Sequence, residues 1–222
     1  MQITRPALSS DYDSVTALQA AYIVTPQTQI KGTKGMYMSV FSQSYFDNSL
    51  LKQGLVYVSH QDGQNDLDAY IALNVGRESC FSDPEEKATV NWVRPEFQEE
   101  YLSTDLMPWR VVSIGLNSER KDRDRMAIAR VCIASIKEFV AIYGMQRQHL
   151  FATYVSNPVN LASQNLQLRR VGGTKIATID FEGGRFGFPN FQRTLVAHNI
   201  KSILSLADQF SEKIEQDSKV EA

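Results

Sequence analysis

Cysteine is scarce in this sequence, whose 222 residues include only Cys80 and Cys132. Two cysteines cannot form the disulfide framework that stabilises small extracellular domains, so we interpret both as reduced thiols of a cytoplasmic protein. Long apolar runs are missing as well. No stretch approaches the roughly 18 apolar residues of a transmembrane helix, and the opening residues MQITRPALSSDYD lack the apolar segment of a signal peptide. We therefore expect no membrane association and no export signal.

An excess of charge of one sign is also missing, because 23 Lys and Arg residues face 25 Asp and Glu residues, for a net charge of −2. Such a balance gives no electrostatic attraction to nucleic acid or to an anionic membrane, and we expect neither as a partner. What is present is an ordinary globular composition, with 43% hydrophobic and 22% charged residues. A chain of this length buries a core without disulfides or metals. We expect one domain over residues 1–222, interrupted by an irregular excursion over residues 77–107.

The order of predicted elements mixes hairpins with strand–helix–strand units. Apolar runs and alternation predict strands over residues 1–5, 55–59, 67–73, 109–116, 150–155, 175–181 and 191–197. Helical spacing predicts helices after Ser9 and over residues 36–51, 95–102, 122–143, 156–168 and 199–216. This order favours an α/β (α+β) fold with a mixed, mostly antiparallel central sheet and helices on both faces.

One segment, residues 110–173, resembles a known family. RVVSIGL, the helix from Met126 to Gly144, and HLFATYVSNPVNLASQNLQLRRVGG follow one another. They are similar to the fourth strand, third helix, fifth strand and fourth helix of the GNAT N-acetyltransferases. In that family the last segment carries an Asn, a small residue, a Tyr and a Gly-Phe pair. The positions matching this pattern are Asn157 or Asn160, Ala162, Ser163 and Gly172, while Leu168 stands near the Tyr position and Gly173 at the Phe position.

The resemblance implies an N-acyltransferase that uses acetyl-CoA or another acyl-CoA and no metal. A small-molecule amine would attack the thioester directly in a ternary complex. The backbone of Ile114, Gly115 and Leu116 at the strand end would hold the pantetheine arm and polarise the carbonyl group, with Gly115 permitting a β-bulge. Asn160 would add a cofactor contact. The family's helix tyrosine often protonates the departing thiolate, and the nearest substitute here is Tyr154.

The turn before the long helix departs from the family pattern. Members carry Q/R-x-x-G-x-G/A there, because glycine lets the backbone approach phosphate, whereas NSERKDRDRMAIA at residues 117–129 has no glycine in any register. Two interpretations stay open. Either side-chain cations replace some backbone contacts to phosphate, or the segment is a solvated helix start whose acidic residues oppose phosphate binding. The candidate cations are Arg120, Lys121, Arg123 and Arg125.

Two alternative functions follow from the same departure. Acyl-homoserine lactone synthases and N-acyl amino acid synthases share the fold and take acyl groups from acyl carrier protein, an acidic partner that a basic segment would suit. A non-catalytic GNAT-like binding or interaction module is the other alternative, because the loop glycines and the helix tyrosine are both missing. The sequence determines neither the acceptor nor the acyl chain length, and it leaves a homodimer open.

The other residues that could bind a metal, react or line a pocket have simpler interpretations. His60, His149 and His198 lie far apart without metal-ligand spacing, so we expect structural roles for them. Cys132 falls on the apolar stripe of the long helix. Several aromatics either line an acceptor pocket or cover the sheet: Trp92, Phe97, Trp109, Phe186 and Phe188. The Gly- and Pro-containing loop over residues 182–190 is a candidate lid.

Overall fold

The computed structural model describes residues 2–21, 23, 40–74, 88–102, 110–116, 126–143, 148–157, 164–185 and 187–220. Its centre is an eight-stranded sheet in the order β1-β2-β3-β5-β6-β8-β7-β4. The strands are β1 (Gln2–Pro6), β2 (Gly54–Gln61), β3 (Leu67–Asn74), β4 (Ala88–Trp92), β5 (Arg110–Leu116), β6 (His149–Asn157), β7 (Thr174–Phe181) and β8 (Gln192–Asn199). All neighbouring strands pair antiparallel except β5 and β6, which confirms the mixed, mostly antiparallel sheet.

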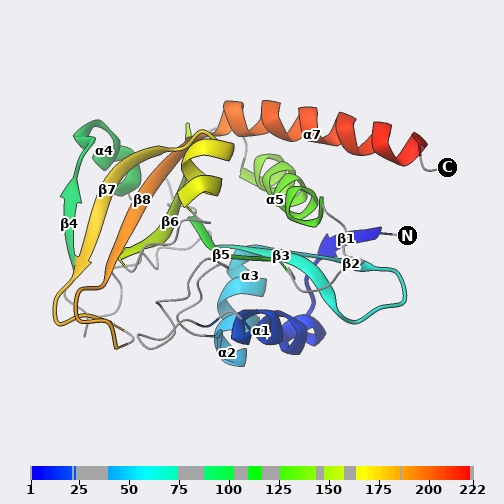
Figure 1. Ribbon diagram of the computed structural model, residues 1–222, viewed down its shortest axis with the longest axis horizontal. Helices are drawn as coiled ribbons and strands as arrows, with labels where there is room; N and C mark the ends of the chain where they lie inside the picture. Colours follow the sequence, from blue (N-terminus) through cyan, green and yellow to red (C-terminus); the bar gives the residue numbers. More distant parts are fainter. Residues whose placement is uncertain are drawn as a thin grey trace.

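Helices lie on both faces of this sheet, as the sequence predicts (Figure 1). One face of the half formed by β1, β2, β3 and β5 is covered by α5 (Ala127–Tyr143), over which α7 (Ile200–Val220) runs. The other face carries the helices of the N-terminal region. These are η1 (Ser9–Asp11), α1 (Tyr12–Ala20), α2 (Gln43–Tyr45), η3 (Phe46–Leu50) and α3 (Leu51–Gln53). None of the helices described is long and apolar enough to span a membrane.

Strand alternation divides the core into layers. In β2, Val56 and Val58 pack toward α1 and η3, whereas Tyr57 packs toward α5 and α7, because successive side chains point to opposite faces. The half formed by β6, β8, β7 and β4 has a third cluster that contains Phe151 and Ile179. That cluster is covered by η4 (Pro95–Phe97) and α4 (Gln98–Leu102). We call it the far-face core.

The structure departs from the predicted elements at the excursion. Residues 88–92 form β4, an edge strand that pairs antiparallel with β7. Ala88, Val90 and Trp92 alternate with polar residues there, but the run is only five residues long and stands in an otherwise polar segment, so the sequence analysis missed the strand. The short helix predicted near Pro95 is confirmed, and the C-terminal helix runs on to Val220. Of the predicted helix over 36–51, residues 40–42 are not helical and residues 43–51 are. The predicted start of the helix over 156–168 is wrong, since Ser156 and Asn157 end β6, and the helical part described runs from residue 164 to residue 170.

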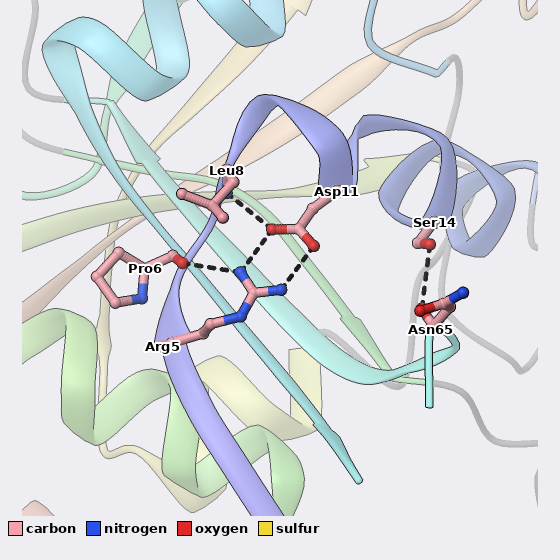
Figure 2. A network of polar contacts seen from close by, with 6 residues as sticks. All are labelled: Arg5, Pro6, Leu8, Asp11, Ser14 and Asn65. Atoms are coloured by element: carbon pink, nitrogen blue, oxygen red, sulfur yellow. Dashed lines mark hydrogen bonds and ion pairs between the residues drawn. The ribbon is translucent and has the colours of Figure 1, made fainter. Parts of the chain in front are cut away.

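An ion pair anchors the N-terminal strand to the first helices (Figure 2). Arg5 donates from Nη1 to Asp11 Oδ2 over 2.7 Å and from Nη2 to Asp11 Oδ1 over 2.8 Å, and the Leu8 N–H donates to Asp11 Oδ2 over 2.7 Å. Burial opposes the charge of Asp11, but these bonds outweigh it and lower the pKa of the carboxyl. The Ser14 hydroxyl donates to the Asn65 carbonyl over 3.2 Å, which ties α1 to the β2–β3 turn.

Candidate functional site

The sheet is split between β5 and β6, its one parallel pair. These strands pair only at Arg110 with Phe151 and at Val111 with Ala152. Beyond those positions β5 continues to Leu116 and β6 to Asn157, and the described residues of the two strands no longer pair with each other. The sheet therefore opens into a wedge with residues 113–116 on one rim and residues 153–157 on the other.

A β-bulge explains where the wedge begins. Ala72 of β3 lies opposite Ser113, but Leu73 lies opposite Val111, so Val112 is an extra residue in β5. A bulge bends its strand and increases the local twist. Pairing with β6 stops at Val111, immediately before this bulge. The wedge is thus a consequence of local backbone geometry in β5.

A second bulge lies on the opposite rim. Val155 pairs with Arg193 and Asn157 pairs with Gln192, which leaves Ser156 as an extra residue in β6. Bulges often sit beside functional sites, where they end regular pairing and redirect a side chain. Both rims of the wedge are therefore bent.

The residues predicted to hold the pantetheine arm lie on the first rim. Ile114 and Gly115 pair with Ile71 and Tyr70 of β3, and Leu116 pairs with Ala69. Because successive residues of a strand point their N–H and C=O groups to alternate sides, about half of these groups face the wedge. The expectation of a bulge at Gly115 is wrong, since that residue pairs regularly. The bulge needs no glycine, because a bulged residue can adopt ordinary right-handed backbone angles.

Tyr154 lies on the second rim and is 8% exposed. It pairs with Thr194 of β8, and directly paired residues share a face of the sheet. On β6, Leu150 packs into the cluster beneath α5, and Tyr154 follows it by an even number of residues. Tyr154 therefore projects on the α5 side of the sheet, at the edge of the wedge.

A row of polar side chains crosses the sheet from the second rim. The Ser156 hydroxyl donates to Gln192 Oε1 over 2.9 Å, and Gln192 Nε2 donates to Asp180 Oδ1 over 2.7 Å. The Asn91 amide donates to Asp180 Oδ2 over 2.6 Å. We call Ser156, Gln192, Asp180 and Asn91 the polar row. It joins β6, β8, β7 and β4, and places a carboxylate two hydrogen bonds away from the wedge.

The polar row and Tyr154 occupy the same face. Gln192 pairs with Asp180, and Thr194, two residues further along β8, pairs with Tyr154. The opposite face carries the far-face core. The row runs from Asn91, which is exposed at the sheet edge, to the wedge. Sequence reasoning missed it because its members come from four strands. The available signal was the alternation of Thr178 and Asp180 with apolar residues.

Five residues predicted to bind the cofactor lie outside the described residues. These are Arg120, Lys121, Arg123, Arg125 and Asn160. The chain order places the first four between Leu116, at the end of β5, and Met126, before α5. Their contribution to phosphate binding stays a prediction.

The aromatic residues cover the sheet. Phe188 is buried in the far-face core, against which Trp92 and Phe97 pack, while Trp109 and Phe186 lie outside the described residues. The predicted lid is a tight turn. Arg185 and Phe188 exchange both backbone hydrogen bonds over 2.9 Å, and a Cβ at Gly184 would collide with the backbone of Phe188. These contacts join the two arms of the loop, and the Gly184 N–H donates to the Phe181 carbonyl at the end of β7 over 3.1 Å.

All three histidines make structural contacts, and for His60 this is a distance of 2.9 Å from Nδ1 to the carbonyl oxygen of Gln61. His149 Nδ1 lies 2.7 Å from Glu100 Oε2, and Glu100 Oε1 accepts the His149 N–H over 3.0 Å, which fastens α4 to the start of β6. His198 is buried, and its Nε2 lies 2.6 Å from Gln167 Oε1. Within the described part of the chain, no three His, Cys, Asp or Glu residues gather as a metal site.

The split sheet with α5 after the first rim strand is the fold of the GNAT N-acetyltransferases. No protein-family model matches the sequence, and no curated protein matches it significantly. An N-acetyltransferase of Staphylococcus aureus Mu50 is similar in structure, with a TM-score of 0.56, 13% identity, and coverage of 90% of this chain and 99% of that one.

Two further structures show likeness. A ribosomal-protein-S5-alanine acetyltransferase of Vibrio fischeri has a TM-score of 0.50 and 12% identity over 89% of this chain and 92% of its own. The acyl-homoserine lactone synthase LasI is less similar, with a TM-score of 0.45 and 13% identity over 90% of each chain. The similarities to the Staphylococcus aureus and Vibrio fischeri enzymes establish the fold, and at these identities they show the fold alone.

Proposed function

We propose that the protein is an N-acyltransferase that moves an acetyl or other acyl group from a CoA thioester to a small-molecule amine. The wedge between β5 and β6 carries this proposal. Its rims offer backbone N–H and C=O groups that have no strand partner among the described residues, and an extended ligand can pair with such groups as an added strand does. The pantetheine arm, with its two amides, has that chemistry.

The donor would lie along the first rim. An N–H group near Ile114–Leu116 would donate to the thioester carbonyl oxygen and stabilise the negative charge that develops there. The pyrophosphate would then meet the segment before α5, where Arg120, Lys121, Arg123 and Arg125 supply cations in place of glycine backbone. Asn160 would contact the donor from the segment after β6.

The amine would approach from the polar row. Asp180 uses two of its lone pairs for Asn91 and Gln192, and a carboxylate has about four such sites, so it can also accept from a cationic amine. The cationic amine gives one proton to solvent, and its nitrogen then attacks the thioester carbon in the ternary complex. The C–S bond breaks, the thiolate takes a proton from the Tyr154 hydroxyl, and the resulting phenolate takes the remaining excess proton from the nitrogen of the new amide.

Thermal melting tests donor binding. Acetyl-CoA or a longer acyl-CoA should raise the melting temperature, because a ligand present at 100 times its Kd adds about 2.7 kcal/mol to the free energy of unfolding. The double variant Arg123→Ala/Arg125→Ala should lose this shift. The control Lys52→Ala/Lys201→Ala, which removes two exposed cations elsewhere, should keep it.

The same measurement separates the alternative functions. A shift with an acylated acyl carrier protein and none with any acyl-CoA would replace the proposed donor with the carrier protein. No shift with either class of donor would reject the acyltransferase proposal and favour a non-catalytic module.

A further inference from the structure

A second site lies in the helical layer above the sheet. A cavity of about 460 Å³, open to solvent on one side, is bordered by α5, η5 (Asn165–Arg170) and α7, with β3, β6 and β8 as its floor. It touches β6 only at Leu150, near the paired end of β5 and β6, and not at Ala152 or Tyr154. The cavity is therefore separate from the wedge, and its volume is in the range of small-molecule sites.

The wall of the cavity is apolar. On α5 it is formed by half-buried residues, Ile128, Ala129, Cys132 and Ile133 among them. Burial raises the pKa of the Cys132 thiol to about 12, although the side chain keeps some accessible surface. Since Cys132 is half-buried and lines the cavity, its accessible surface faces that space. This part of α5 is left uncovered by the helices that pack on it.

The shape of the cavity favours an extended chain. Its residues on α5 run from Met126 to Ile136, a rise of about 15 Å at 1.5 Å per residue. An extended aliphatic chain can lie along this apolar wall of α5.

The charge at the rim selects the head group. Arg169 and Arg170 at the end of η5 border the cavity and are exposed, and neither forms an ion pair with a described residue. None of the described residues that line the cavity is acidic. The amide oxygen of Gln167 is already bonded to His198. An anionic group seated at this rim would meet two cations and no opposing carboxylate.

We propose that this cavity binds an amphiphile with one aliphatic chain and an anionic head, as in a fatty acid. The chain lies against Ala129, Cys132 and Ile133, and the head contacts Arg169 and Arg170. The site goes beyond the proposed acyl transfer and does not depend on it. Figure 1 shows η5 (yellow) beside the start of α7, on the same side of the sheet as α5.

Chain length provides the first test. Hexanoate, decanoate and tetradecanoate are titrated into the full-length protein by calorimetry. Each methylene that enters the cavity should strengthen binding about fourfold, until the cavity is full and the affinity levels off. An affinity that does not change with chain length, or no binding of tetradecanoate, would overturn the proposal.

Matched variants locate the chain. Ala129→Phe fills the cavity and should weaken decanoate binding at least tenfold, whereas Ala141→Phe, at an exposed position of the same helix, should leave it unchanged. Both variants are checked for a cooperative thermal transition. Should Ala129→Phe not yield folded protein, Ile133→Ala keeps the test open, because it removes chain contacts and should weaken binding. Unchanged affinity in the cavity variants would contradict the assignment.

Charge variants locate the head group. Arg169→Gln and Arg170→Gln should each weaken decanoate binding about two- to fivefold, the range of an exposed ion pair. Binding of decanol should not change, and the control Lys175→Gln, an exposed cation on β7, should affect neither ligand. An equal loss for decanoate and decanol would reject the role of the arginines.

The source of the chain is resolved by competition. If a free fatty acid is the natural ligand, decanoate displaces a fluorescent fatty acid and decanoyl-CoA does not. If the natural ligand is the acyl chain of a donor, decanoyl-CoA displaces the fluorescent fatty acid and acetyl-CoA does not. Displacement by neither decanoate nor decanoyl-CoA would overturn the proposal. Fatty-acid binding without any acyl-CoA melting shift would reject the acyltransferase and leave this site standing.

Discussion

The Ser156 hydroxyl donates to Gln192 Oε1 over 2.9 Å, and this bond joins the bulge on the wedge rim to the centre of the second half of the sheet. Gln192 in turn donates to Asp180, so the Gln192 side chain alone links the Asp180 carboxylate to Ser156 on the wedge rim. An acceptor bound at Asp180 would lie on the face that Tyr154 shares. In the proposed reaction Asp180 binds the acceptor and Tyr154 protonates the thiolate, so a variant of each should affect a different step.

Asp180→Asn should weaken acceptor binding. The substitution keeps the shape of the side chain but removes the negative charge, and a hydrogen bond to a charged group contributes about 1.5–3 kcal/mol. The KM for a cationic amine should rise about tenfold or more in steady-state kinetics. The acetyl-CoA melting shift should not change. Asp208→Asn, at an exposed acid of α7, is the control. A KM equal to that of the unmodified protein would remove Asp180 from the acceptor site.

Tyr154→Phe should slow the chemical step and leave donor binding intact. Loss of a positioned general acid typically costs about 100-fold or more, so kcat should fall by that order while the melting shift with acetyl-CoA persists. Tyr57→Phe, at another buried tyrosine on β2, serves as the control. If kcat is unchanged, the thiolate obtains its proton elsewhere, and Tyr154 is a structural aromatic.

His198 should make stability depend on pH. Burial lowers its pKa from 6.5 to about 4. Between these values the unfolded chain binds a proton and the folded chain does not, so stability falls as the pH drops from 6.5 to 4, by about 3 kcal/mol at most. Above pH 6.5 this contribution is fully present.

Urea unfolding at pH 7 and at pH 4.5 measures this effect. His198→Gln removes the titrating group, and the loss of stability between the two pH values should be smaller in the variant than in the unmodified protein. Equal losses in the two proteins would show that His198 is not the group that titrates.

The pair of Arg5 and Asp11 should stabilise the N-terminal region above the carboxyl pKa. The folded pKa of Asp11 lies below its usual 3.8, so its stabilisation is present above pH 3.8 and is lost as the pH falls through the lowered folded value. Asp11→Asn should cost about 2 kcal/mol at pH 7. Denaturant unfolding should show this difference shrinking below pH 3.8. Asp13→Asn, at an exposed acid of α1, should cost little.

Local pattern was enough to predict most of the elements. The apolar stripe of Met126, Ala129, Ile133, Ile136 and Val140 predicted a helix ending near Tyr143, where α5 does end. Of these residues Ile136 is buried and the others are half-buried, because the most buried side of α5 carries Ala127 and Val131 instead. Alternation predicted the β2–β3 hairpin and the β7–β8 pair. These features depend on the spacing of side chains within one segment, which is visible in the sequence. The order of the segments then implied the GNAT-like sheet.

The details of the candidate site depended on tertiary structure. The bulge at Val112 is defined only by the register of β5 against β3. Asn91 and Asp180 are 89 positions apart, and Ser156 and Gln192 are 36 apart, so no local pattern indicates that they meet. The cavity between α5, η5 and α7 exists because three separate helices leave a space between them. The sequence by itself determined the elements and their order, because these follow from local periodicity. The wedge, the polar row and the cavity were decided by the packing of distant segments.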